Sequence, residues 1–536
     1  MGLLIDHADD VVRTIMSTPV THPSTSQAAG QQATPPSPGT RRRQAIGGGL
    51  GVVLAIAAYV AMPDDALSTV LAADPEAAGT VTEHGLRLTA AVAILMGAWW
   101  MSEAIPLAAT ALVPLVIFPI ANVSSLEDTA KPYASGTIFL FMGGFMLALA
   151  MQRWNLHRRI ALLTVTALGV RPKSLVLGFM LATGFLSMWV SNTATAVMML
   201  PIGTSILILT GQMEQASGQG RSGRTRFATG LMLGIAYAAS IGSLGTIIGT
   251  PPNTLLIAHL RETYGIGIGF GQWMVMGVPL AVVFLLIAWW LLTSVLFRPE
   301  IDEIPGGKEI IRDELRAMGP LTSGEACVAV VFVTAALSWA LIPTLWPDSP
   351  LSDNVIAVLV ALVLFAVPAP GQKGTRLLDW ESAKDLPWDV LLLFGGGLAL
   401  SAQFSSQGLS VWIGESAKGL GVLPVVLLVA AVTCLVIFLT ELTSNTATAA
   451  AFLPIIGGIA VGLGIDPLLL VVPVALAATC AFMLPVATPP NAIAYGSGYV
   501  DMKDMIKAGM WLNIIGLILI TITVLGLGVP VLGIEL

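Results

Sequence analysis

The stretch VSNTATAVMMLP, residues Val190–Pro201, is nearly repeated as TSNTATAAAFLP, residues Thr443–Pro454. Two other phrases also occur twice in the chain: FMGG at 141–144 and FGGG at 394–397, GTPPN at 249–253 and ATPPN at 487–491. The SNTAT pair and the glycine pair are offset by the same 253 residues. Phrases that recur in one register indicate an internal duplication of the chain.

The composition of the duplicated chain is that of a membrane protein. Of its 536 residues, 55% are hydrophobic and 11% are charged, and the mean hydropathy is +0.84. Apolar runs that approach the roughly 20 residues needed to cross hydrocarbon recur along the chain. The sequence therefore predicts an all-α polytopic membrane protein with about eleven transmembrane helices. The net charge of −7 comes without a basic stripe, which argues against a nucleic-acid partner.

Basic residues predict the orientation of the spans. Residues 1–45 are rich in Ser, Thr, Gln and Pro and end at Arg41–Arg43, so we predict a disordered cytoplasmic tail. Basic residues follow the span that holds FMGG and precede the span that holds FGGG. The positive-inside rule sends these spans through the membrane in opposite directions and leaves the C-terminus extracytoplasmic. We predict an inverted repeat with halves at 46–320 and 321–536.

Each half is predicted to contain one re-entrant hairpin, at about 174–210 and at about 421–462, broken at the SNTAT phrase. A helix broken in the membrane frees backbone groups that must face protein, water or a ligand. Ser, Thr and Asn add neutral oxygens of the kind that hard monovalent cations bind, and the proline pairs of TPPN free further carbonyl groups. The glycine pairs are interpreted as close-packing positions.

The regions around these phrases lack fixed positive charge. Lys and Arg are absent from residues 174–220, 227–260 and 419–502. Burying a dianion without a countercharge is expensive, so an anion bound here would need mobile cations that enter with it. This pattern indicates sodium coupling.

The quoted phrases resemble the divalent-anion/sodium symporter family, which includes sodium-dicarboxylate and citrate cotransporters. The resemblance runs from about residue 85 to the C-terminus and is carried by these stretches: FMGGFMLALAMQRWNLHRRIAL, SNTATAVMMLPI, IIGTPPN, LPWDVLLLFGGGLAL, ELTSNTATAAAFLPI and ATPPNAIAYGSGYV. It implies an elevator-type homodimer in the inner or plasma membrane, with a scaffold and a mobile transport domain built around the hairpins. It also implies two or more sodium ions bound per protomer.

The resemblance also implies the binding residues. One sodium site would use Ser187, Ser191, Asn192 and the backbone near Gly249, and a second would use Thr440, Thr443, Asn445 and the backbone near Ala487. The substrate carboxylates would meet Asn192, Thr193, Thr250, Asn445, Thr446, Thr488 and Pro489. Within each phrase we expect the serine, Ser191 or Ser444, to serve sodium. The threonine two residues later has a hydroxyl donor for a carboxylate.

The leading hypothesis is sodium-coupled symport of a C4-dicarboxylate dianion such as succinate, malate or fumarate into the cell. Sulfate or tricarboxylate symport, dicarboxylate exchange and a passive anion channel are the alternatives among transport functions. A membrane-embedded enzyme would need a nucleophile beside a base. The five histidines lie in the tail, in loops or at span ends, so we do not expect an enzyme.

Overall fold

The computed structural model describes residues 38–169, 171–216, 225–301, 307–346, 349–372 and 374–535. In these ranges the secondary structure is helical, with two isolated bridges and no strand. The chain divides into Met1–Ala45 and Ile46–Leu536. In the first unit the described residues are the opening turns of α2 (Pro38–Ala61). The rest of the predicted tail lies outside the described residues.

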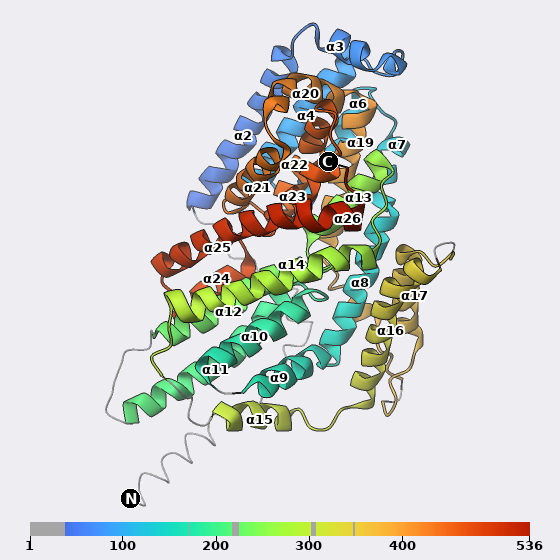
Figure 1. The fold of residues 1–536 in the computed structure, drawn as a ribbon. Coiled ribbons are helices and arrows are strands. Elements are labelled where there is room, and N and C mark those ends of the chain that lie inside the picture. Colours follow the sequence, from blue (N-terminus) through green and yellow to red (C-terminus); the bar gives the residue numbers. More distant parts are fainter. Residues whose placement is uncertain are drawn as a thin grey trace, which may run out of the picture. The chain divides into compact units, whose positions relative to one another are not determined.

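The helices of the second unit are arranged as Figure 1 shows. In chain order they are α3 (Ala66–Ala73), α4 (Glu83–Ser102), α5 (Leu107–Thr110), α6 (Val113–Ile120), α7 (Leu126–Ala130), α8 (Gly136–Arg153), α9 (Leu156–Leu168), α10 (Pro172–Ser187), α11 (Asn192–Ala216), α12 (Arg226–Ser243), α13 (Pro251–Tyr264), α14 (Phe270–Trp290), α15 (Gly307–Ala317), α16 (Ser323–Leu345), α17 (Asp353–Ala366), α18 (Trp380–Ala383), α19 (Trp388–Ser406), α20 (Leu409–Ala417), α21 (Val425–Thr440), α22 (Asn445–Gly462), α23 (Leu468–Ala478), α24 (Pro489–Gly496), α25 (Met502–Thr523) and α26 (Val529–Leu532).

Several apolar helices are too short to span a membrane alone. Within the described ranges, eight helices are long and apolar enough to cross, and a ninth span results if the bent pair Leu409–Val422 and Val425–Thr440 counts as one. Shorter apolar helices include α10, α17 and α23. Length and composition therefore yield fewer spans than the predicted eleven or so, because several predicted spans are interrupted.

The two helices that lead into the TPPN turns are buried on every side. Residues 227–243 of α12 and residues 468–478 of α23 are all buried. A helix that is apolar all round belongs in an interior. The first hairpin, α10–α11, packs on α12, and the second, α21–α22, packs on α23. The two repeats therefore build the same unit, in which a hairpin covers a buried helix that ends at TPPN.

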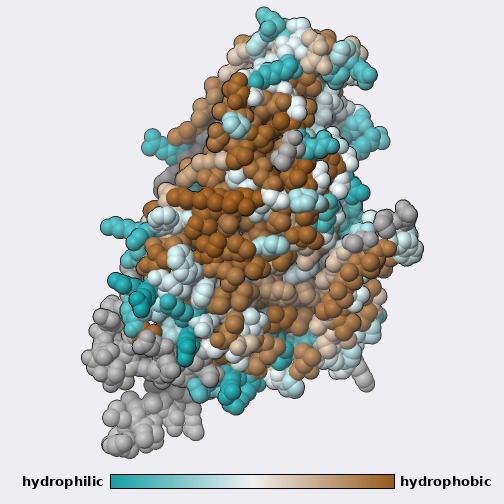
Figure 2. Space-filling view, in the orientation of Figure 1, coloured by the Kyte–Doolittle hydropathy of each residue, from teal (hydrophilic) through white to brown (hydrophobic). Residues whose placement is uncertain are grey.

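Apolar side chains also lie on the outer surface of the helical unit. Figure 2 shows hydrophobic residues across the middle of the view, over α14 and α25. On α25 the exposed side chains Ile514, Ile518 and Ile522 recur every four residues along one face. A continuous apolar surface of this kind is expected where a helix faces lipid. The chain is a multi-pass membrane protein.

The duplicated glycines sit where another segment of the chain closely approaches their helix. A Cβ added at Gly143 of α8 would lie 2.5 Å from the carbonyl oxygen of Ala357 in α17, and one added at Gly396 of α19 would overlap the backbone of Ala111. The close-packing interpretation is confirmed, because a side chain at either position would push the packed segments apart.

Candidate functional site

The first hairpin breaks at the SNTAT phrase. Helix α10 ends at Ser187 and α11 begins at Asn192. The Ser187 hydroxyl oxygen lies 2.7 Å from Asn192 Oδ1 and 2.5 Å from the carbonyl oxygen of Ala239 in α12. Asn192 donates from Nδ2 to the Ser243 hydroxyl at 3.3 Å. That bond turns Oδ1 of the amide toward Ser187.

The second hairpin repeats this arrangement. Helix α21 ends at Thr440 and α22 begins at Asn445. The Thr440 hydroxyl oxygen lies 2.8 Å from Asn445 Oδ1 and 2.8 Å from the carbonyl oxygen of Ala478 in α23. Each repeat therefore gathers a hydroxyl, an amide and a backbone oxygen from the two hairpin helices and the buried helix beneath them.

These two oxygen clusters have a shortage of hydrogens. A hydroxyl group carries one hydrogen, so Ser187 or Thr440 can donate to one of its two neighbouring oxygens and not to both. The other oxygen faces a lone pair, which is electrostatically unfavourable unless a positive charge is shared among them. Neutral and carbonyl oxygens in this number are the ligands that hard cations take. Chemically, both clusters are suited to hold a cation.

The TPPN turns are held by their asparagines, a role for which the sequence analysis did not single them out. Asn253 donates from Nδ2 to the Thr246 carbonyl at 2.9 Å, and Asn491 donates to the corresponding Leu484 carbonyl at 3.2 Å. Both amides also reach a second carbonyl of the turn, Ser243 or Ala481. The Oδ1 atoms of both asparagines are buried and have no hydrogen bond among the described residues. The recurrence of PPN is the signal that could have identified them.

The threonine of each TPPN turn precedes its helix in an extended conformation, with φ of −143° at both Thr250 and Thr488. The prolines that follow occupy the first helical turn, where no N–H donor is needed. The Thr488 hydroxyl accepts from the backbone amide of Asn491. In contrast, Thr250 Oγ1 lies 3.4 Å from Thr479 Oγ1 at the end of α23. The turn of the first repeat thus touches the buried helix of the second.

The remaining predicted residues differ in their surroundings. Thr193 and Pro489 are exposed, while Ser444 and Thr446 are half-buried. The Ser191 hydroxyl accepts from the Ala194 amide at the start of α11. Thr443 donates to the Leu439 carbonyl and lies 2.6 Å from the Thr448 hydroxyl, so its hydroxyl group is engaged within the hairpin.

Gly249 and Ala487, the positions whose backbone is predicted to bind sodium, differ in their packing. A Cβ added at Gly249 would overlap the Ser243 carbonyl oxygen, whereas Ala487 occupies the matching place with its own methyl group and is buried. The turn of the first repeat is therefore more closely packed than that of the second.

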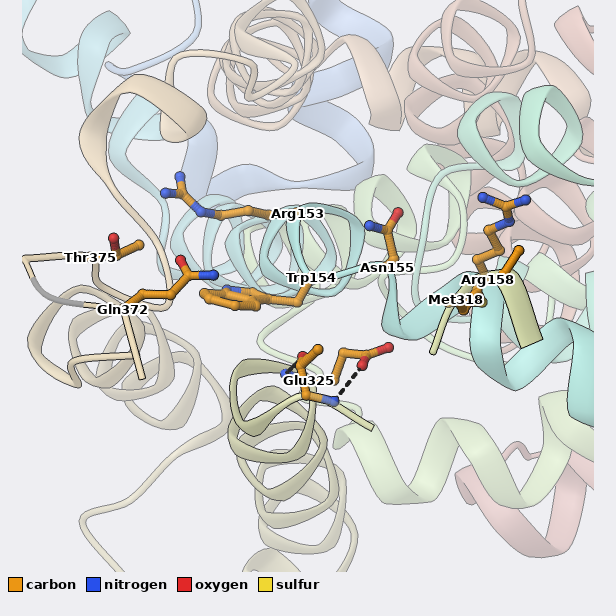
Figure 3. Close-up of a pocket in the computed structure, with 10 residues that line it drawn as sticks. Arg153, Trp154, Asn155, Arg158, Met318, Glu325, Gln372 and Thr375 are labelled. Carbon is orange, nitrogen blue, oxygen red and sulfur yellow. Dashed lines mark hydrogen bonds between the residues drawn. The ribbon is translucent and has the colours of Figure 1, made fainter. Parts of the chain in front are cut away.

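A surface hollow of about 490 Å³ lies apart from the predicted site residues (Figure 3). Its lining residues are Arg153, Trp154, Asn155, Arg158, Ala317, Met318, Thr322, Glu325, Gln372 and Thr375. Arg153 pairs with Asp379 at 2.6 Å and Arg158 pairs with Glu314 at 2.5 Å, and Figure 3 shows the two guanidinium groups pointing apart. The amide of Ser382 and the Arg153 guanidinium hold the pKa of the Asp379 carboxyl below its usual value. These arginines are already neutralised, so the hollow does not offer a dianion site.

Two solved structures share the fold. The Alcanivorax borkumensis YdaH transporter is 14% identical with a TM-score of 0.52, and the match covers 84% of this chain and 99% of that one. Neisseria gonorrhoeae MtrF is also 14% identical with a TM-score of 0.52, over 77% of this chain and 87% of its own. At this identity the likeness concerns the fold alone.

Sequence relatives are much nearer. The sodium-dependent dicarboxylate transporters SdcS of Staphylococcus saprophyticus and of Staphylococcus aureus strain USA300 are each 44% identical over 451 residues, which is 83% of this chain and 86% of theirs. The family model described as the sodium:sulfate symporter transmembrane region matches residues 66–534. The resemblance inferred from the duplicated phrases is confirmed, and the chain belongs to the sodium:sulfate symporter family.

Proposed function

We propose that this protein carries C4-dicarboxylate dianions into the cell together with sodium ions. The observation that carries the proposal is the pair of hydrogen-poor oxygen clusters at Ser187 and Thr440. Relatives at 44% identity are named sodium-dependent dicarboxylate transporters, which supports both the cation and the substrate class.

Sodium supplies the charge that the site itself lacks. A dicarboxylate placed between the SNTAT phrases and the TPPN turns would find no Lys or Arg in residues 174–220, 227–260 or 419–502. Desolvating two negative charges is favourable only beside compensating positive charge. Two sodium ions make the loaded carrier neutral for a dianion. A third would make transport electrogenic, at about 2.3 kcal/mol per 100 mV for the extra charge.

Each cluster has a proposed set of ligands. The first sodium site consists of Ser187, Ser191, Asn192 and the carbonyl groups of Ala239 and Gly249. The second consists of Thr440, Thr443, Asn445 and the carbonyl groups of Ala478 and Ala487. Thr443 must turn away from Thr448 to take part. The substrate carboxylates meet Thr193, Thr250, Thr446, Thr488, Pro489 and the amide groups of Asn192 and Asn445.

Transport follows an elevator movement in this proposal. The two hairpins pack on α12 and α23, and α12 also contacts α24 of the other repeat. These elements, with α13, which follows the first TPPN turn as α24 follows the second, form one mobile body. It slides against the uninterrupted helices α8, α17 and α19, with the N-terminus in the cytoplasm and two copies of the chain in a dimer. Rigid-body movement suits a site made from both repeats, because both sets of ligands travel together.

The direct test is uptake of radiolabelled succinate into proteoliposomes. We expect uptake to require sodium on the side of the substrate and to be competed by fumarate and malate. Equal uptake in potassium would contradict sodium coupling. Sulfate is the second candidate substrate because the family description names it. Competition by sulfate at lower concentrations than malate would favour that assignment instead.

A further inference from the structure

Glu441, the residue after Thr440 of the second oxygen cluster, has a buried carboxylate. Glu441 follows Thr440 at the end of α21 and is 3% exposed. Its Oε1 accepts from the amide of Phe482 at 2.7 Å, from the amide of Met483 at 2.9 Å and from Asn513 Nδ2 of α25 at 2.8 Å. Its Oε2 accepts from the amides of Met483 at 3.1 Å and Leu484 at 3.2 Å. A single carboxylate therefore binds three consecutive amides of the turn that precedes TPPN.

This turn is held from two sides. The amide of Phe482 donates to Glu441, and the carbonyl of the same peptide group, that of Ala481, accepts from Asn491 at 3.0 Å. At Leu484 the amide donates to Glu441 while the carbonyl accepts from Asn491. A planar peptide points its N–H and C=O in opposite directions, so fixing the amides also fixes where the carbonyl groups of this turn point.

The first repeat has no such carboxylate. The position that matches Glu441, 253 residues earlier, is Met188. Its carbonyl accepts from the Thr246 hydroxyl, and its side chain lies against Gly245. Asn253 holds the turn from one side as Asn491 does, but the other side is held by neutral groups. The two halves of the duplication are thus chemically unequal at this point.

We propose that Glu441 is a positioning residue that gives the second sodium site a higher affinity for sodium than the first. This inference rests on the proposed function. The carboxylate fixes the backbone turn between Ala478 and Ala487, whose carbonyl groups are proposed ligands of that site, and it belongs to the residue that follows the ligand Thr440. The ion pairs among the described residues do not include Glu441, and in this proposal the sodium ion of the second site provides the balancing positive charge.

The test is the sodium dependence of Glu441→Gln in the full-length protein. The amide keeps the shape of the side chain, removes the charge and turns a donor toward backbone donors. Hydrogen bonds to a charged group are worth enough to change affinity by roughly ten- to a hundredfold. We expect the sodium concentration for half-maximal succinate uptake to rise by about tenfold or more, with the succinate KM at saturating sodium within about twofold of wild type.

A second readout does not require transport. Sodium added without succinate should raise the Tm of the wild-type protein in detergent, because a ligand that binds the folded state stabilises it. In Glu441→Gln this rise should need correspondingly more sodium. Glu381→Gln, which removes an exposed carboxylate paired with Lys384, is the matched control and should behave as wild type.

Asn513→Leu keeps the charge of Glu441 and removes one donor to it, so it should shift the sodium curve in the same direction by roughly two- to fivefold. If Glu441→Gln does not fold, the sodium dependence of Asn513→Leu tests the inference in its place. A lower maximal rate with unchanged sodium dependence in these variants would overturn the inference and leave Glu441 a structural cap. Sodium-independent uptake by the wild-type protein would instead overturn the proposed function.

Discussion

The Nδ1 atom of His259 lies 2.7 Å from the hydroxyl oxygen of Ser401. His259 belongs to α13, which continues from the first TPPN turn, and Ser401 belongs to the uninterrupted helix α19. Thr263 of α13 also contacts the Ser401 hydroxyl, at 3.0 Å. Close by in sequence, Glu262 accepts from Ser135, which precedes α8, at 2.9 Å. The C-terminal end of α13 therefore joins the proposed mobile body to two helices of its surroundings.

An elevator movement would have to break the contacts at Ser401. Ser401→Ala removes both of them, and losing a hydrogen bond of ordinary strength should shift the balance between conformations by roughly two- to tenfold away from the arrangement described here. One dye is placed at residue 497, just after α24 of the mobile body, and the other at residue 372, which lines the surface hollow. Fluorescence energy transfer between them would measure the populations of the two conformations. Ser406→Ala, at the exposed end of the same helix, serves as the control. Identical populations in both variants would argue against a sliding contact between α13 and α19.

The hydroxyl groups of the two oxygen clusters should be needed for sodium and not for folding. Ser187→Ala and Thr440→Val should each raise the sodium concentration for half-maximal uptake by about tenfold, because each removes a cation ligand. Thr433→Val is the matched control, since Thr433 lies on the same helix as Thr440 and bonds to the Val429 carbonyl of its own helix. The idea fails if Thr433→Val shifts the sodium curve as much as Thr440→Val does.

Cation and substrate roles should separate within one SNTAT phrase. Thr446→Val keeps the shape and deletes a donor, so it should raise the succinate KM by roughly ten- to a hundredfold with little change in sodium dependence. Ser191→Ala should move the sodium curve and raise the succinate KM only at limiting sodium, since coupling between two ligands is reciprocal. Uptake over a grid of sodium and succinate concentrations distinguishes the variants. The same pattern in both would refute the assigned roles.

The tighter turn of the first repeat should not accept a side chain. Gly249→Ala places a methyl group against the Ser243 carbonyl, and we expect a loss of about 1–3 kcal/mol of stability, as for other overpacked positions. Ala487→Gly in the second repeat opens space and should cost less, about 1 kcal/mol. Thermal unfolding in detergent measures both. Equal Tm values for the two variants would show that the turns are equally tight.

Labelling with a membrane-impermeant thiol reagent tests the inverted repeat. A cysteine at position 213, in the last turn of α11, should react from the cytoplasm, and one at position 420, before the second hairpin, should react from outside. The background should lack Cys327, Cys434 and Cys480. Reaction of both positions from the same side would refute opposed hairpins.

The sequence by itself determined where the helices break. The hairpin helices end at Ser187 and Thr440 and begin again at Asn192 and Asn445, as the polar phrases predict. The TPPN turns also lie where the prolines place them. Proline removes an amide donor and restricts the residue before it, and these effects act within a few residues, so they can be predicted without the fold. Family membership followed from the same phrases.

Only the tertiary structure decided which distant groups complete each site. The carbonyl groups of Ala239 and Ala478 lie beside the hairpin hydroxyls because α12 and α23 pack beneath the hairpins, and an alanine in an apolar helix carries no sequence signal. The contact of Thr250 with Thr479, and that of Glu441 with Asn513, likewise joins residues far apart in the chain. Every residue has a backbone carbonyl, so the choice of ligand depends on packing, which local sequence patterns do not encode.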